Sequence, residues 1–422
     1  MTRRPIMAGQ ANGTFGSNWI SLPVLIGALD SSSYIYLLSG TTELAFYAAV
    51  LLLKLAALAF AAEDLGQARR FLPFAAVALL AIITSSFAND VTLLEALKPV
   101  GAIVSIILTL TIVRHDITGY AKGMALSCGV ICGLYLASAA AGVLETTGNR
   151  HAFFNGHHPN LGGELISTTL VMAAFALKPR LFTPLAIAAL YCTFLMQSRT
   201  STVAILVSIG CYFTFHSSIR WGWRSTALAA ATVLSLLAGF VAVAAAFQQE
   251  SFEAIYRFVI DSVFLVEDEY RGGDSGLSGR DQHWLAAIEV ISEHPFIGVG
   301  PDFTARQGGL QPHNWLLYAV TQYGVFGWVL AALFLAAALK AIKHQPLRLI
   351  AFVPLFVPWL LNDRFLNFNV YPFVLYILAF APFPAATRQK AGASLSRLRS
   401  RRTSGGPMHP HLPRRYREQQ AT

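Results

Sequence analysis

Long apolar runs recur through almost the whole chain, and they constrain the fold more than any other feature of the sequence. A hydrocarbon core about 30 Å thick takes about 20 helical residues to cross, and runs of roughly that length can be drawn about 12 times. Only 13% of the residues are charged, against roughly 25% in soluble domains. The sequence therefore predicts an all-α, polytopic transmembrane bundle. The approximate runs are 19–38, 43–60, 71–87, 94–113, 119–143, 160–177, 181–197, 201–217, 224–247, 314–339, 347–362 and 370–385.

Basic residues set the expected orientation of these spans. The segment 386–422 carries nine Lys and Arg against one acid, Glu418. The positive-inside bias places such a tail in the cytoplasm, and alternation through twelve spans places the N-terminus there too. No cleavable signal is predicted before the first run. The tail is poor in apolar residues and is expected to be disordered, either as a topology determinant alone or also in contact with anionic lipid.

The same topology divides the chain into four parts. We predict nine spans in 1–247, a large outer loop with short helices in 248–313, three spans in 314–385 and the basic tail in 386–422. Arginine on the outer side runs against the positive-inside bias, so an outer arginine is a better functional candidate than an inner one. Pairing with loop acids is the alternative. The outer arginines are Arg150, Arg199, Arg257, Arg271, Arg280, Arg306 and Arg364.

The outer loop contains a predicted helix that begins near Arg280. Ser278 followed by Asp281 has the spacing of a capping box, and apolar residues then recur at helical spacing until Pro295. Arg280 would lie in the first turn, where the free N–H groups already favour an anion. A guanidinium there suits a phosphate or diphosphate. A simple ion pair with Asp281 or another loop acid is the alternative reading.

His313 follows Pro312 at the expected start of the tenth span. An imidazole at this boundary can be neutral near pH 7 and take a proton from a hydroxyl, so His313 is a candidate general base. Gly324 and Gly327 within the same run would allow close helix packing.

Several motifs resemble the bacterial O-antigen ligase and polysaccharide polymerase family of integral membrane glycosyltransferases. The resemblance covers about 155–330, and its pieces follow one another in order on the predicted outer side. They are His158-Pro159-Asn160-Leu161-Gly162, Ser198-Arg199-Thr200, Gly279-Arg280 with Trp284, Pro295 to Gly300, and His313-Asn314 followed by Gly324 and Gly327.

The resemblance implies an enzyme of the bacterial inner membrane, with both termini cytoplasmic and a periplasmic active site. Its donor would be a glycan linked to undecaprenyl diphosphate, and its acceptor another glycan or the lipid A core. His313 would be the catalytic base, and Arg280 and Arg199 would hold the diphosphate. Asn160 and Asn314 would bind substrate. For Arg199 the alternative is an interfacial arginine that reaches the headgroups.

No metal or other cofactor is predicted, since Asp302 and Asp363 look isolated and the four cysteines lie in apolar runs. Asp30 and Lys54 fall near the middle of the first two spans, where an ion pair is expected and a proton relay is the alternative. A secondary transporter would suit twelve spans, but it should concentrate polar groups near the midplane. A non-catalytic partner in polysaccharide export also stays open; nucleic acid is not an expected ligand.

Overall fold

We describe the protein from a computed structural model. The structure describes residues 21–39, 42–61, 65–113, 116–147, 150–221, 280–304, 306–359, 365–368 and 370–381. Apart from one antiparallel hairpin between Thr146–Thr147 (β1) and Arg150–His151 (β2), the regular elements within these ranges are helices. The predicted all-α class is therefore confirmed.

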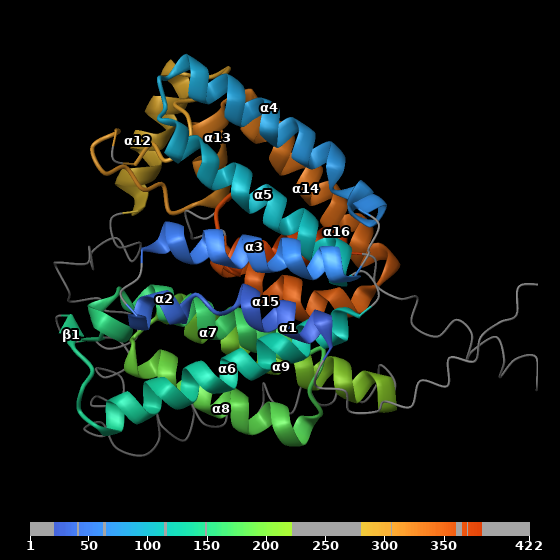
Figure 1. Cartoon of the computed structure of the whole chain (residues 1–422). Helices are drawn as coiled ribbons and strands as arrows, with labels where there is room; N and C mark the ends of the chain where they lie inside the picture. The colour runs from blue at the N-terminus through green and yellow to red at the C-terminus, as the bar shows by residue number, and fades with distance from the viewer. Residues whose placement is uncertain are drawn as a thin grey trace, which may run out of the picture. The chain divides into compact units, whose positions relative to one another are not determined.

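The first group of helices precedes the hairpin, and Figure 1 shows α1 beside α6, against which it packs. The members of this group are α1 (Leu22–Asp30), α2 (Tyr34–Ser39), α3 (Glu43–Ala61), η1 (Leu65–Arg70), α4 (Leu72–Ala88), α5 (Leu93–Val113) and α6 (Ile117–Ala140). Those that follow the hairpin are η2 (Phe154–Gly156), α7 (Pro159–Ala173), α8 (Pro179–Leu195), α9 (Arg199–Trp221), α12 (Arg280–Glu293), α13 (Trp315–Tyr323), α14 (Val325–His344), η6 (Pro346–Arg348), α15 (Leu349–Trp359) and α16 (Val370–Phe380).

Several of these helices have the length and composition of membrane spans. Among the described residues α5, α6 and α14 are each long and apolar enough to cross a membrane, and α4, α8, α16 and Thr200–Thr214 within α9 are shorter apolar helices. All of them coincide with predicted runs, so the chain is an integral membrane protein. The count of about 12 spans stays a prediction, because the ninth run, 224–247, lies outside the described residues.

The first predicted span is two helices rather than one. α1 ends at Asp30 and α2 begins at Tyr34. Between them the Ser31 hydroxyl donates to the Gly27 carbonyl over 2.7 Å, and the Ser32 hydroxyl donates to the Leu29 carbonyl over 2.6 Å. Serine hydroxyls that bond back to the preceding turn compete with the helical backbone ladder, which gives a local reason for the break.

The tenth predicted span, 314–339, is also two helices, so the prediction of one continuous helix from Asn314 is wrong. Gly324 separates α13 from α14 with φ +55° and ψ −130°, a conformation that favours glycine. A Cβ at Gly324 would lie 2.5 Å from the carbonyl carbon of Phe296. α14 is long enough to cross a membrane alone, and α13 packs against both α14 and α12.

Segments predicted to lie outside meet at one end of the helices. Tyr47, near the start of α3, stacks on Phe368 with ring centroids 4.6 Å apart. Trp315, the first residue of α13, stacks on Phe365 at 6.0 Å. Asn155, in the segment before α7, donates to a carbonyl in the last turn of α2 over 2.9 Å. These contacts agree with the alternation inferred from basic residues.

The segments predicted to lie inside also meet one another. Arg348, between α14 and α15, donates to the carbonyls of Leu378 and Ala381 at the end of α16, the second over 2.7 Å. A guanidinium in this position satisfies carbonyls that the helix end leaves free. Phe71, just before α4, packs against Phe380 with ring centroids 5.0 Å apart.

The predicted ion pair between Asp30 and Lys54 is present and buried. The Lys54 ammonium also donates to the Ser105 hydroxyl over 2.6 Å. The second Asp30 oxygen accepts hydrogen bonds of 3.0 Å from Thr109 and Tyr120. Both charges are thus paired and hydrogen-bonded, as burial in an apolar interior requires, and the network ties α1 to α3, α5 and α6.

Candidate active site

Arg280 begins α12, as the sequence predicted. Ser278, the expected capping residue, lies outside the described residues. Arg280 is half-buried, and three residues later His283 is half-buried on the same side of the helix. Ala287, one turn beyond His283, is fully buried, so Arg280 and His283 lie on the side of α12 that faces the protein.

His313 lies two residues before α13, in the left-handed region at φ +46°. The prediction that His313 begins a membrane span is therefore wrong. His313 precedes the short helix α13, and the span α14 comes after that helix. Asn314 is the N-cap of α13, and its side-chain oxygen accepts from the N–H groups of Leu316 and Leu317 over 2.9 and 3.1 Å. Asn314 thus has a structural role as a helix cap, which typically stabilises a protein by about 1 kcal/mol. The role of Asn314 in substrate binding stays a prediction.

The structure brings His313 to α12. The rings of His283 and His313 meet edge to face, with centroids 5.6 Å apart. Since Arg280 lies one turn before His283, the arginine and His313 belong to one neighbourhood at the adjoining starts of α12 and α13 (Figure 1). His283 was not among the site residues predicted from sequence; its position three residues after Arg280 on a predicted helix was the available signal.

The segment between α12 and α13 is held by a small core of its own. Ala287, Val299, Phe303 and Leu310 are buried together. The N–H groups of Val299 and Gly300 donate to the carbonyls of Thr321 and Gln322 in α13, each over 2.9 Å. These contacts fix the segment against both helices, and thereby fix the region from which His313 projects.

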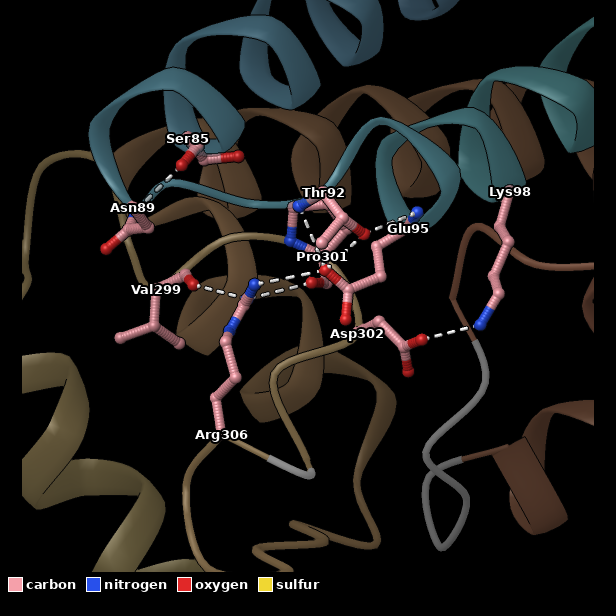
Figure 2. Close-up of polar contacts among 9 residues, drawn as sticks. All are labelled: Ser85, Asn89, Thr92, Glu95, Lys98, Val299, Pro301, Asp302 and Arg306. Atoms are coloured by element: carbon pink, nitrogen blue, oxygen red, sulfur yellow. Dashed lines mark hydrogen bonds and ion pairs between the residues drawn. The ribbon is translucent and has the colours of Figure 1, made fainter.

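Polar contacts also join this segment to the turn between α4 and α5, as Figure 2 shows. Asn89 donates to the Gly298 carbonyl over 3.0 Å and to the Ser85 carbonyl over 2.7 Å. Arg306 donates to the carbonyls of Val299 and Pro301, each over 2.9 Å.

Two ion pairs also join the segment between α12 and α13 to α5. Arg306 lies 3.6 Å from a Glu95 carboxylate oxygen, and Lys98 lies 2.6 Å from Asp302. Asp302, which looked isolated in the sequence, therefore has a partner. Arg306 was one of the outer arginines considered as functional candidates, with pairing to an acid as the alternative; its contacts with backbone carbonyls and Glu95 favour a structural role in fixing the loop.

The remaining predicted site residues lie at the starts of α7 and α9. His158 caps α7, and its Nδ1 accepts from the Asn160 N–H over 3.3 Å. Arg199 is the first residue of α9. The two helix starts are close, because a Cβ on Gly163 in α7 would lie 2.5 Å from the Ser198 hydroxyl. The starts of α7 and α9, which contain Asn160 and Arg199, thus form a second neighbourhood.

The segment 365–368 and α16 lie between the two neighbourhoods. Phe365 stacks on Trp315 at the start of α13, and its carbonyl accepts from Tyr376 of α16 over 3.3 Å. α16 in turn packs against α7. Residues 365–368 and α16 therefore connect the start of α13 with α7. Convergence of Arg199, Asn160, Arg280 and His313 on one cavity stays a prediction.

Within the described ranges, no group of three or more His, Cys, Asp and Glu side chains is placed to hold a metal ion. The groups at the candidate site are the imidazoles of His283 and His313, the Arg280 guanidinium and the N-terminal N–H groups of α12. Such a set suits proton removal and the binding of an anionic group.

Helical spans and a polar site at the helix starts define an integral membrane protein with candidate anion-binding and proton-accepting groups. The profile of the family described as O-antigen ligase matches residues 184–332. This part of the chain is thus similar to that family, which confirms the resemblance drawn from the motifs. The match includes Arg199, Arg280 and His313 and leaves Asn160 outside. The comparison with curated proteins gave no match.

Proposed function

We propose that the protein is a membrane glycosyltransferase that transfers a glycan from undecaprenyl diphosphate to an acceptor sugar hydroxyl at the periplasmic face of the bacterial inner membrane. The observation that carries the proposal is the neighbourhood of Arg280, His283 and His313 within the part of the chain that matches the family. The family match supports an O-antigen ligase or polymerase type of enzyme; the donor, the acceptor and the membrane face belong to the proposal.

In this mechanism His313 accepts the proton of the acceptor hydroxyl as its oxygen attacks the anomeric carbon of the donor sugar. The bond between that carbon and the diphosphate oxygen breaks, and the electron pair leaves with the lipid diphosphate. A positioned general base typically contributes about 10²–10⁴-fold to the rate. His283, beside His313, holds the imidazole in position through ring contact.

Arg280 stabilises the leaving diphosphate. Its guanidinium lies in the first turn of α12, where free backbone N–H groups and the positive end of the helix dipole also favour an anion. A planar guanidinium can bind two phosphate oxygens at once. Fixed positive groups favour departure of the leaving group, because they stabilise charge where it develops.

Arg199 and Asn160 serve the same substrate from the second neighbourhood. Arg199, at the start of α9, is the second diphosphate ligand, and Asn160, in the first turn of α7, donates a hydrogen bond to substrate. Asn314 contributes its side-chain amide N–H groups, while its oxygen caps α13. Membrane lipids and other polysaccharide export proteins are the further partners.

Transport is the second candidate function, since the first span is broken beside the buried Asp30–Lys54 pair and transporters place broken helices near the midplane. Both charges of that pair are already hydrogen-bonded within the protein. The concentration of polar groups at the helix starts therefore favours the transferase over the transporter.

A deletion strain tests the proposal through its lipopolysaccharide and exopolysaccharide. Cores that bear a single repeat unit indicate a lost O-antigen polymerase, whereas bare cores with accumulated lipid-linked polymer indicate a lost ligase. Loss of secreted polymer alone indicates an exopolysaccharide polymerase, and a polymerase is the expected outcome. Unchanged glycan profiles would contradict the proposal.

A further inference from the structure

The outward side of α12 has an apolar edge and a polar edge. Leu285 and Ile288 are exposed on the first, and Leu285 is 68% exposed. Gln282, Glu289 and Glu293 are exposed along the second. An amphipathic helix normally buries its apolar side against the protein. Here the apolar edge faces outward, beside a polar edge that suits water.

Phe296 extends the apolar edge beyond the end of α12. α12 ends at Glu293, and a turn follows in which the Gly298 N–H donates to the His294 carbonyl over 3.0 Å. Phe296 lies in this turn, directly after the last residues of α12. Phe296 is 74% exposed.

This apolar edge reaches α14 directly. The N–H of Val325, the first residue of α14, donates to the Phe296 carbonyl over 3.2 Å. Val325 is exposed, and so are Trp328 and Val329 in the next turn. Phe296 therefore lies beside the exposed apolar start of a membrane span.

The exposed side of α14 is the side that faces lipid. Its outward residues recur at helical spacing along the whole span, while the opposite side is buried in the protein. A helix that is apolar all round and partly buried in protein contacts acyl chains with its remaining surface. The exposed large apolar residues are Val325, Trp328, Val329, Leu335 and Leu339.

We infer that α12 is an interfacial helix, whose apolar edge and Phe296 enter the membrane leaflet that surrounds the first turns of α14. The occupant is phospholipid, because the exposed Phe296 is hydrogen-bonded through its backbone to Val325, the first residue of the exposed apolar side of α14. Glu289 and Glu293 then face water, as the polar side of an interfacial helix does. This inference does not depend on the proposed enzymatic activity.

The arrangement has a consequence for the candidate site. Arg280 and His283 lie on the protein-facing side of the same helix, next to His313. A helix held at the membrane surface would keep these groups at headgroup depth. Part of the segment predicted from sequence as a large outer loop thereby lies within the membrane interface.

The test uses the full-length protein in vesicles of phosphatidylethanolamine and phosphatidylglycerol. The photoreactive amino acid benzoylphenylalanine replaces Leu285, Ile288 or Phe296, one at a time, and replaces Glu289 or Glu293 as matched controls on the same helix. Illumination is followed by mass spectrometry of protein-bound phospholipid. Ile297, also exposed, replaces any test position at which the variant fails to reach the vesicles.

Phospholipid adducts at the apolar positions, at least severalfold above those at Glu289 and Glu293, are the expected result. Equal adduct yields on the two edges would overturn the inference. Crosslinks from the apolar positions to another part of the chain, or to a second copy, in place of phospholipid would also overturn it. The inference would also be overturned if the apolar positions formed no phospholipid adduct in vesicles while the benzoylphenylalanine at those positions still reacted in detergent.

Discussion

His283 and His313, from two different elements, meet edge to face with ring centroids 5.6 Å apart. We predict that His283→Gln lowers transfer about tenfold, as expected when a general base worth about 10²–10⁴-fold is kept but less well positioned. The measurement is the polymer or ligation product formed at equal protein level, together with its pH profile. A full rate with an unchanged pH profile would show that His283 does not position His313.

The second prediction concerns Arg280 at the start of α12. Arg280→Lys keeps a positive charge and loses the planar fork that binds two phosphate oxygens. We expect product formation to fall at least tenfold, with protein level unchanged. Arg306→Lys is the matched control, since Arg306 contacts backbone carbonyls and Glu95. Equal activity of Arg280→Lys and the natural protein would argue against bidentate binding of a diphosphate.

The third prediction concerns the turn after α4, where the Asn89 side chain donates to the Gly298 carbonyl. Asn89→Ala removes this contact and leaves the Gly298 carbonyl without that donor, at a cost of about 1–3 kcal/mol. Hydrogen exchange at the Val299 and Gly300 amides should become faster, because the segment they belong to is less firmly held. Ser292→Ala, an exposed change in α12, is the control. Unchanged exchange in Asn89→Ala would mean that the segment is fixed by its other contacts.

The fourth prediction separates structure from proton transfer at Asp30 and Lys54. Asp30→Asn alone leaves a buried ammonium without its counter-charge, which typically costs about 3–5 kcal/mol, so the melting temperature in detergent should fall. The double variant Asp30→Asn, Lys54→Met should recover most of that loss and keep glycan transfer. A double variant that is stable but inactive would indicate that the pair has a functional role.

The long apolar runs predicted most of the helices, because the length and hydropathy of a run are enough to identify a membrane-spanning helix. They could not predict the two breaks. Ser31 and Ser32 end α1 through hydroxyl bonds to nearby carbonyls, and Gly324 turns the chain where Phe296 packs against it. Such breaks depend on contacts that a hydropathy pattern does not contain.

The candidate site was predicted in part. Arg280 at a helix start followed from capping and periodicity, whereas the contact between His283 and His313 joins residues 30 positions apart and depends on how α12 packs against α13. The structural role of Arg306 was equally hidden, since its partners come from residues 95 and 299–301. The positive charge that both residues carry could not show that Arg306 has a structural role while Arg280 lies at the candidate site.

The central claim is that His313 is the general base of glycan transfer, and complementation of the deletion strain tests it most directly. Plasmids that encode the natural protein, His313→Ala or the control His294→Ala are compared at equal protein level in the membrane. His294 is an exposed histidine at the end of α12. The account predicts that His294→Ala restores the polymer, and that His313→Ala loses it by about 10²-fold or more. Full restoration by His313→Ala would contradict the account.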